Sequence, residues 1–342
     1  MMTGSDIRAA RRQHSGRARD IAEAMGVSEA QLVASGVGEG TTAIGPDPNQ
    51  IVPLLEPLGP CMALTRNPSC VIEKDGIYSD FHGGDHACMT LSPQIDLRMF
   101  PKHWVYGYAV EEEVKGATRR SVQVFDASGT AVHKTYLREG ADLDAWSRLT
   151  GALALDDQSD TITVSAPPPP EGARMNPEKR EILLQEWARL TDTHQFLRLC
   201  AKLRMNRLGA YRIAEAPFVR PLAPTILPEL LETVRAAAIP VMIFVGNRGC
   251  IEIHSGPIGR LQAMGPWENV LDPGFNLHLR GDHVAEVWAV EKPTHRGPAL
   301  SVEAFDAEGN LILQLFPVPK PPLDSRAPWA EIVAGLRDLE PA

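Results

Sequence analysis

The chain has 342 residues, of which 44% are hydrophobic and 23% charged, a composition typical of a globular protein with one large or two medium domains. Its 34 basic and 43 acidic residues give a formal net charge of -9, which disfavours binding to nucleic acid or to anionic membranes because phosphate contacts need a cationic surface. The N-terminus lacks an apolar signal core, the apolar run over 236–245 is about half a membrane span, and the 5 cysteines form no C-x-x-C pair. We therefore expect a cytoplasmic protein with reduced thiols, no membrane insertion and no nucleic-acid partner.

The first half of the sequence predicts helices followed by strands. Apolar spacing predicts helices over 18–34 and 50–58. Alternating and apolar residues then predict a strand pair over 121–125 and 131–137. Residues 156–179 include four consecutive prolines at 167–170, which fix φ and remove backbone donors, so we expect an extended linker there.

The second half predicts the same order of elements. Helices are expected over 178–190, 193–204 and 228–238, and Thr191 or Asp192 is a plausible N-cap for the second of them. Strands are expected over 301–305 and 311–316, with turn residues between them. Helices followed by antiparallel strands, twice over, predict an α+β fold.

The two halves also share a sequence repeat in which equivalent positions are separated by one constant shift. Residues 121–129 (SVQVFDASG) and 301–309 (SVEAFDAEG) are identical or alike at 7 of 9 positions, and Cys70 aligns with Cys250. Met25, Leu91, Pro93 and Leu97 align at the same shift with Met205, Leu271, Pro273 and Leu277. A constant shift without gaps indicates duplication. We predict a tandem structural duplication related by a pseudo-twofold, each half combining helices with a large antiparallel sheet: an N-terminal repeat over 1–155, a linker over 156–179 and a C-terminal repeat over 180–342.

Motifs for catalysis or metal binding are scarce. His82 and His86 have a spacing that resembles a metal pair, but two intervening glycines make a helix unfavourable, so a loop is the better interpretation. The sequence contains neither G-x-S-x-G nor a glycine-rich phosphate loop.

His194 is the strongest single candidate for a ligand. It is predicted in the first turn of a helix, where the helix dipole opposes protonation and leaves an imidazole nitrogen free for a metal. Phe196, Leu199, Cys200 and Leu203 follow at helical spacing and are expected to pack one face of that helix. From these residues alone, a surface or core histidine is the simpler interpretation.

Five stretches carry a resemblance to a known family: residues 95–98 (IDLR), 186–187 (EW), 191–196 (TDTHQF), 244–250 (FVGNRGC) and 291–294 (EKPT). They resemble the cytoplasmic haem-utilisation proteins of Gram-negative bacteria, the HemS, ChuS, ShuS, HmuS and PhuS group, often called hemin-degrading factors. The resemblance spans nearly the whole chain. That family is also a tandem duplication, in agreement with the repeat.

The resemblance implies haem b in a cleft of the C-terminal half, with His194 as the axial ligand of the iron. It implies Arg98, reached from the N-terminal half, as a distal and catalytic residue with Phe100 beside it. The remaining implied haem contacts are Arg207, Phe244, Lys292 and Gln314.

Chemistry suits these implied roles, although each has an alternative. Haem propionates need cationic partners such as Arg207 and Lys292, and the alternative for both is a solvated surface charge. A distal guanidinium can hydrogen-bond a bound water or dioxygen, and the alternative for Arg98 is an interdomain salt bridge.

Three positions depart from the family pattern. Phe316 stands where a tyrosine is common, and Lys320 lies in a Pro-Val-Pro-Lys stretch that replaces an arginine of some members. His14 occupies the repeat position of His194 without the ligand motif. The sequence therefore leaves open whether the N-terminal half binds a second haem.

Two functions fit this resemblance. The first is an enzyme that degrades haem oxidatively and releases iron, with electrons from an external donor because no flavin or nicotinamide motif is present. The alternative is a chaperone that carries haem to a separate haem oxygenase without degrading it. In both, the expected partner is haem delivered by an inner-membrane importer. The ligand set is the same for each, so the sequence does not distinguish an enzyme from a chaperone.

Overall fold

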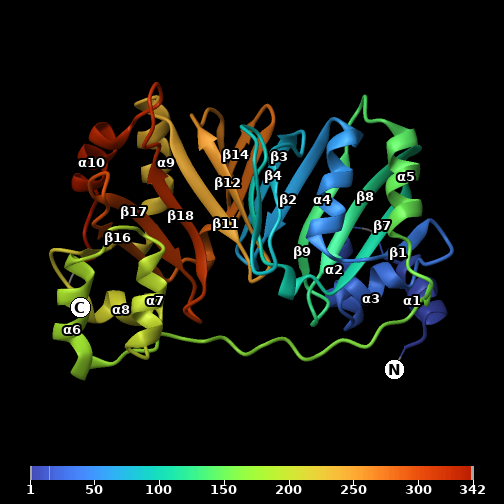
Figure 1. Cartoon of the computed structure of the whole chain (residues 1–342), viewed down its shortest axis with the longest axis horizontal. Helices are drawn as coiled ribbons and strands as arrows, with labels where there is room; N and C mark the ends of the chain where they lie inside the picture. The colour runs from blue at the N-terminus through green and yellow to red at the C-terminus, as the bar shows by residue number, and fades with distance from the viewer. Residues whose placement is uncertain (1, 15, 340–342) are drawn as a thin grey trace. The chain divides into compact units, whose positions relative to one another are not determined.

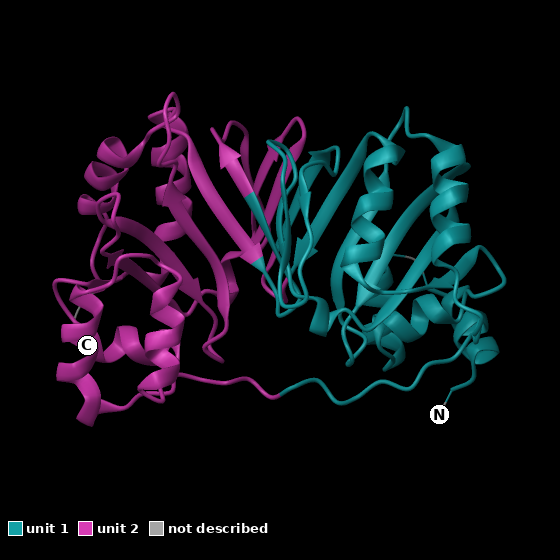
Figure 2. Ribbon diagram, viewed as in Figure 1, with its two compact units in different colours: residues 1–66, 71–168, 246–253 teal, residues 67–70, 169–245, 254–342 magenta. Residues whose placement is uncertain are grey.

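The computed structural model describes residues 2–14 and 16–339 and is shown in Figure 1. The chain forms two compact units, coloured separately in Figure 2. Unit 1 consists of Met1–Arg66, Val71–Pro168 and Gly246–Ile253, and unit 2 consists of Asn67–Cys70, Pro169–Val245 and His254–Ala342. Each unit therefore contains most of one half of the sequence and a short segment of the other.

Unit 1 contains antiparallel strands in the order β1-β7-β8-β9-β2-β3. In a second group, β12 (Cys250–Gly256), whose residues 250–253 belong to unit 1, pairs with β6, β6 with β5 and β5 with β4. Its strands are β1 (Thr41–Ile44), β2 (Cys61–Arg66), β3 (Cys70–Gly76), β4 (Phe81–His82), β5 (Cys88–Leu91), β6 (Asp96–Met99), β7 (Tyr106–Val114), β8 (Ala117–Phe125) and β9 (Ala131–Leu137). Its helices are α1 (Gly4–Arg11), α2 (Ala18–Met25), α3 (Glu29–Ala34), α4 (Pro48–Leu55) and α5 (Leu143–Leu153), with 3-10 turns at Glu56–Leu58 and Pro101–His103.

Helices cover both faces of the β7–β9 sheet because its strands alternate apolar residues on the two sides. Ala109, Val122 and Val124 pack with residues of α4 and α5. Tyr108 and Phe125, on the opposite face, pack with residues of α3. The sheet is therefore the middle layer of unit 1 (Figure 1).

Unit 2 repeats this arrangement. Its strands are β10 (Val219–Leu222), β11 (Val241–Gly246), β12 (Cys250–Gly256), β13 (Leu261–Met264), β14 (Trp267–Asp272), β15 (Phe275–Arg280), β16 (Glu286–Lys292), β17 (Ala299–Phe305) and β18 (Leu311–Pro317). Its helices are α6 (Arg180–Ala188), α7 (Gln195–Lys202), α8 (Arg207–Ala214), α9 (Leu227–Ala236) and α10 (Arg326–Ala334), with 3-10 turns at Pro177–Lys179, Pro224–Ile226 and Gly281–His283. The strands β10-β16-β17-β18-β11 and β15-β14-β13 are antiparallel neighbours in that order.

The predicted duplication and the α+β class are confirmed. Strands β2, β3 and β9 reappear as β11, β12 and β18 at the shift of the sequence repeat, and both ends of each strand are reproduced. A register irregularity between Val124 and Phe125 recurs between Ala304 and Phe305 at the same shift. Local distortions of a sheet are reproduced only when the whole arrangement is copied.

Several helix boundaries differ from the sequence prediction. The single helix predicted over 18–34 is two helices, because Gly26 ends α2 in the left-handed region (φ 67°) and Ser28 begins α3 with a capping box. Helices α1, α5, α8 and α10 were not predicted. Residues 156–176 contain no helix or strand (Figure 1), and the boundary between the units falls among their prolines. Within the described residues, no helix is long and apolar enough to cross a membrane.

Candidate functional site

His194 lies in the turn that leads into α7. The helix begins at Gln195, so His194 is the N-cap residue, and the predicted cap at Thr191 or Asp192 is wrong. The physical reason is that the Asp192 carboxylate accepts the backbone N–H of His194 (2.7 Å) and so closes a turn before the helix. The side chain of Gln195 closes the same turn by accepting the N–H of Thr191 (3.0 Å).

Asp192 also orients the His194 ring. Its carboxylate oxygen lies 2.6 Å from His194 Nδ1. The hydrogen bonds from the His194 backbone and ring lower the pKa of Asp192 below its ordinary value, so the carboxylate is an acceptor and Nδ1 carries the hydrogen. Nε2 is then the nitrogen with a free lone pair, and the side chain is 91% exposed. A carboxylate that fixes the tautomer of a histidine in this way is typical of metal-ligating imidazoles.

Helix α7 is anchored by the aromatic ring two residues after His194. Phe196 is buried, with its ring 4.4 Å from the Trp187 ring and 5.6 Å from the Tyr211 ring. Leu199 and Cys200 are buried on the same side of the helix, as predicted, and so is Leu203 just after it. The start of α7 therefore has a fixed position on the core while the imidazole itself faces outward.

A buried carboxylate beneath these aromatic rings gathers two cations. Glu303 accepts hydrogen bonds from Arg207 Nη1 (2.8 Å), Lys292 Nζ (2.9 Å) and Tyr211 OH (2.9 Å). Lys292 Nζ also donates to Tyr211 OH (3.0 Å) and lies 5.0 Å from the centre of the Phe196 ring. These four residues, Arg207, Tyr211, Lys292 and Glu303, are the Glu303 cluster.

The charges of the Glu303 cluster are tightly coupled. Burial alone raises the pKa of Glu303, but Lys292 and Arg207 outweigh it and hold that pKa well below its ordinary value. Burial lowers the pKa of Arg207 and the Glu303 charge raises it, with a net rise. The side chain of Arg207 is 21% exposed, whereas that of Lys292 is 4% exposed. Arg207 is therefore the cation of this cluster with surface available to a ligand.

Two further predicted residues lie on the same face of the sheet as Glu303. Gln314 is its direct partner across β17 and β18, and Phe244 is the partner of Gln314 across β18 and β11. Directly paired residues of antiparallel strands point to the same face. The Phe244 ring lies 5.3 Å from the ring of Phe316. Unit 2 thus brings Arg207, Lys292, Gln314 and Phe244 to the face that carries α6, α7 and α8.

Arg98 and Phe100 belong to unit 1. The Arg98 guanidinium, on β6, pairs with Asp96 of the same strand and donates to the carbonyl of Leu97 (3.0 Å). Phe100 follows β6 and its N–H donates to the carbonyl of Gly249 (2.9 Å).

The other histidine motif runs from the end of a strand into a loop and forms no helix. His82 ends β4 with its Nε2 2.9 Å from Asp80, and Gly83 begins the loop that leads to His86. No group of three or more His, Cys, Asp or Glu residues suited to a metal ion occurs in the described part of the chain.

Sequence reasoning missed Asp192 as the partner of the His194 ring and missed Glu303 altogether. The sequence pattern suggests Asp192 only as a possible helix cap, although its spacing of two residues from the histidine suits a ring hydrogen bond. Glu303 stands in an apolar strand, and a charged residue at a buried strand position indicates a partner.

Comparisons with known proteins identify the family. The profile of the Haemin-degrading HemS.ChuX domain matches residues 26–153 and again residues 204–336. The chain belongs to this family. It is 33% identical to the Hemin transport protein HmuS of Yersinia pestis, over 96% of this chain and 95% of that protein.

Solved structures agree. The fold is similar to holo-PhuS, a heme-binding protein from Pseudomonas aeruginosa, with 40% identity, a TM-score of 0.91 and coverage of 98% of this chain and 97% of that one. It is also similar to ChuS, an E. coli Heme Oxygenase, with 29% identity, a TM-score of 0.86 and coverage of 96% and 98%. The haem-utilisation family inferred from short motifs is confirmed over nearly the full length of the chain.

Proposed function

We propose that this protein binds haem in haem-iron utilisation, with Nε2 of His194 as the axial ligand of the iron. The observation that carries the proposal is the hydrogen bond between Asp192 and Nδ1, which leaves Nε2 of an exposed imidazole as the nitrogen available to the iron. Three family members of high coverage, described as a hemin transport protein, a heme-binding protein and a heme oxygenase, support it.

Within unit 2, the Glu303 cluster is the proposed partner of the haem propionates. Arg207 has five N–H donors, of which the structure commits one nitrogen to Glu303, so the guanidinium can bind a second carboxylate. Lys292 reaches a propionate only if that carboxylate joins or replaces Glu303 at the buried ammonium group. We therefore expect Arg207 to contribute more to haem affinity than Lys292. Phe244 and Gln314 supply the apolar and amide surface on the same sheet face.

Our first candidate activity is oxidative degradation of haem, with an external electron donor. Its support is the similarity to ChuS, described as a heme oxygenase. The second candidate is transport of haem to a separate oxygenase, favoured by the 91% exposure of the His194 side chain and by the similarity to the hemin transport protein HmuS. In both, haem is the cargo or substrate, and the chain's residues ligate the iron and neutralise the propionates.

The test of the binding proposal is the spectrum of the protein loaded with ferric haem. His194→Ala is expected to lose the wild-type Soret band, because it removes the iron ligand. The matched control is His295→Ala, since His295 is also exposed and its N–H donates to the carbonyl of Thr191 (3.0 Å) in the same turn. A wild-type spectrum in His194→Ala, or its loss only in His295→Ala, would overturn the assignment.

The two activities are separated by turnover. The loaded protein is given a reductant in air with catalase present, and the products are followed by absorbance and mass spectrometry. Ring-opened tetrapyrrole formed despite catalase supports degradation. Bleaching that catalase abolishes supports transport. Arg98 remains a predicted distal residue, and Arg98→Ala is expected to slow ring opening while the ferric spectrum of the His194-bound haem persists.

We also propose that the protein acts in the cytoplasm. Its 5 cysteines, Cys61, Cys70, Cys88, Cys200 and Cys250, are all buried, and Cys61, Cys88, Cys200 and Cys250 are free thiols. Burial raises the pKa of Cys88 to about 11 and that of Cys200 to about 12. Buried free thiols such as these four are typical of proteins in a reducing compartment.

A further inference from the structure

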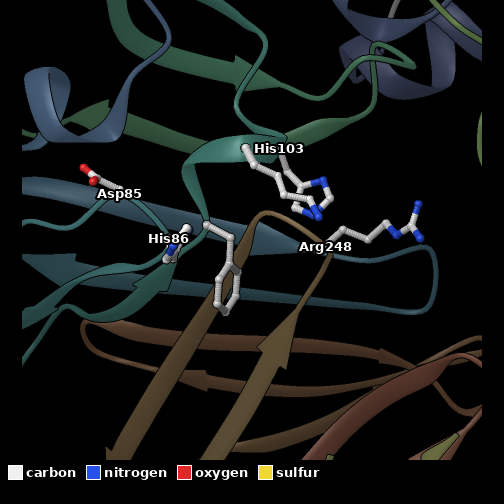
Figure 3. Close-up of a pocket in the computed structure, with 6 residues that line it drawn as sticks. Asp85, His86, His103 and Arg248 are labelled. Atoms are coloured by element: carbon white, nitrogen blue, oxygen red, sulfur yellow. The ribbon is translucent and has the colours of Figure 1, made fainter. Parts of the chain in front are cut away.

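Unit 1 contains a cavity of about 410 Å³ that shares Phe100 with the residues expected at the haem, whereas its other lining residues have no predicted part there. Its lining comes from the loop after β4, from the segment after β6 and from the turn between β11 and β12: Asp85, His86, Phe100, Lys102, His103 and Arg248. In Figure 3, Asp85 and His86 lie on one side, and His103 and Arg248 lie together on the other. We call this cavity the Lys102 pocket.

The cationic side of the pocket is built on a rigid turn. The carbonyl of Gly249 accepts the N–H of Phe100 (2.9 Å) and the indole N–H of Trp104 (2.8 Å). Asn247 caps the turn by accepting the N–H of Gly249 (2.9 Å), and its side-chain amide donates to backbone carbonyls of β2 and of β9. Arg248, at the tip of the turn, is therefore presented from a fixed backbone, which lowers the entropy lost on binding a ligand.

The cations of the pocket have no anionic partner among the described residues. No ion pair or side-chain hydrogen bond engages Lys102, His103 or Arg248 there. Burial lowers the pKa of His103, and the charges of Lys102 and Arg248 lower it further, against an opposing effect of Asp126. Both cations therefore act on the His103 imidazole, Asp126 opposes them from a distance, and neither cation forms an ion pair with a described residue.

In unit 2, the position equivalent to Lys102 carries a carboxylate that neutralises a neighbouring cation. In unit 2 the equivalent turn is also fixed, since the carbonyl of Ser69 accepts the N–H of Arg280 (2.8 Å). There the Arg280 guanidinium is paired with both oxygens of Asp282 (2.8 and 2.7 Å), and Ser69 Oγ lies 3.0 Å from Nδ1 of His283. In the sequence repeat, Asp282 is the counterpart of Lys102. In unit 2 a carboxylate therefore neutralises the nearby cation, whereas in unit 1 the equivalent position adds another positive charge.

We propose that the Lys102 pocket binds the anionic group of a small molecule, a carboxylate or a phosphate, between Lys102 and Arg248. Phe100 supplies an apolar wall for the body of that molecule, and His103 a further hydrogen bond. Lys102 and Arg248 match the anion by charge, and the guanidinium of Arg248 is able to bind it with two parallel hydrogen bonds. The proposal concerns unit 1 alone and is independent of the iron ligand.

The test uses the full-length protein without haem, at low ionic strength, titrated with inorganic phosphate and separately with benzoate. Lys102→Gln combined with Arg248→Gln is expected to raise the dissociation constant of the bound probe at least about tenfold, since both charge-assisted contacts are lost. The control combines Arg17→Gln with Lys179→Gln, two exposed cations outside the pocket, and changes the net charge equally. It is expected to alter affinity less than about twofold.

The two probes distinguish the source of the anion. Tighter binding of phosphate indicates a phosphate ester as the natural ligand, and tighter binding of benzoate indicates an aromatic carboxylate held against Phe100. If neither probe saturates the wild-type protein, or if the pocket variant and the control bind equally, the proposal is wrong.

A second variant copies unit 2. Lys102→Asp is expected to abolish probe binding and to raise the pKa of His103, measured by NMR, because a cation is replaced by a carboxylate while Asp126 and Arg248 remain. The midpoint of urea unfolding should match the wild type, which separates this effect from misfolding. Retained probe binding in this variant, with an unmoved His103 titration, would remove Lys102 from the pocket and overturn the proposal.

Discussion

Each unit has one carboxylate, one arginine and one lysine clustered on the same sheet face, but the helix layer supplies the carboxylate in unit 1 and the arginine in unit 2. In unit 1, Glu29 of α3 is the buried carboxylate, and it pairs with Arg66 of β2 and Lys134 of β9. In unit 2, Glu303 is on a strand and receives Arg207 from α8 and Lys292 from β16.

The difference between the two clusters can be followed at equivalent positions of the sequence repeat. In the sequence repeat, Gln123 of unit 1 corresponds to Glu303, and Lys134 corresponds to Gln314. The helix layer therefore brings an anion to the sheet in unit 1 and a cation in unit 2. In the second arrangement the arginine comes from the helix layer, and the Arg207 side chain is 21% exposed against 12% for Arg66 of unit 1, so Arg207 is the more accessible to the carboxylates of a ligand. A duplicated fold can thus keep its layers while its two copies draw a cluster of the same charges from different elements.

The largest expected effect comes from removing the carboxylate at the centre of the Glu303 cluster. Glu303→Gln leaves Arg207 and Lys292 buried without a counter-charge and is expected to lower the free energy of unfolding by about 3–5 kcal/mol. Urea denaturation at pH 7 measures it. Glu29→Gln should cost unit 1 a comparable amount, because its cluster has the same composition.

The control for both substitutions is Glu308→Gln, an exposed carboxylate in the turn after β17, which should change the free energy by less than about 0.5 kcal/mol. Equal stability of Glu303→Gln and the control would mean that the cluster is not needed for folding of unit 2.

The next comparison concerns pH. In unit 1, His133 is buried against Tyr78 and Thr65, and burial lowers its pKa to about 3; its counterpart in unit 2 is Leu313. Because the unfolded imidazole titrates near pH 6.5, the unfolded state binds more protons between pH 6.5 and 3, so this residue reduces stability as the pH falls.

Burial also raises the pKa of Glu252 to about 8. The folded state then binds the extra proton between pH 4.5 and 8, so Glu252 reduces stability as the pH rises.

The two residues oppose each other between pH 4.5 and 6.5, so single variants separate them. His133→Leu should make the slope of unfolding free energy against pH more negative than in the wild type, by about 1.4 kcal/mol per pH unit. Glu252→Gln should shift the slope by a similar amount in the opposite direction. Urea titrations at pH 4.5, 5.5 and 6.5 measure both, and slopes unchanged from the wild type would contradict the buried neutral states.

The fold was largely accessible from the sequence because a repeat and alternating strands are local patterns. The hairpins over 121–137 and 301–316 and the duplication follow from them. The break at Gly26 and the short helix α8 were missed because caps and tertiary packing decide them. At the site, resemblance supplied His194. The bond from Asp192 is local and depends on the geometry of one turn, whereas the central place of Glu303 depends on chain segments that only folding brings together.

Asp192 provides a smaller and more specific test of the unit 2 site. Asp192→Asn keeps the shape of the side chain but removes the anionic acceptor that holds Nδ1 of His194. Haem affinity is expected to fall by about 10–100-fold, as for other residues that orient a ligating histidine, measured by Soret titration. Asp156→Asn, at an exposed carboxylate outside this turn, is the control. Undiminished affinity in Asp192→Asn would mean that the ring is oriented by the haem alone.

The smallest expected effect comes from restoring in unit 2 a tyrosine that unit 1 retains. Tyr136 on β9 corresponds to Phe316 on β18, where the family commonly has a tyrosine. The Phe316 ring lies 5.3 Å from that of Phe244, on the face with the Glu303 cluster. Phe316→Tyr adds one hydroxyl there, and one hydrogen bond to haem is worth about 0.5–1.5 kcal/mol, so we expect haem affinity to rise by about 2–10-fold. Phe81→Tyr in unit 1 adds the same group away from the cluster and should leave affinity unchanged. If both variants bind haem like the wild type, this end of β18 does not face the porphyrin, and the site lies nearer to Arg207.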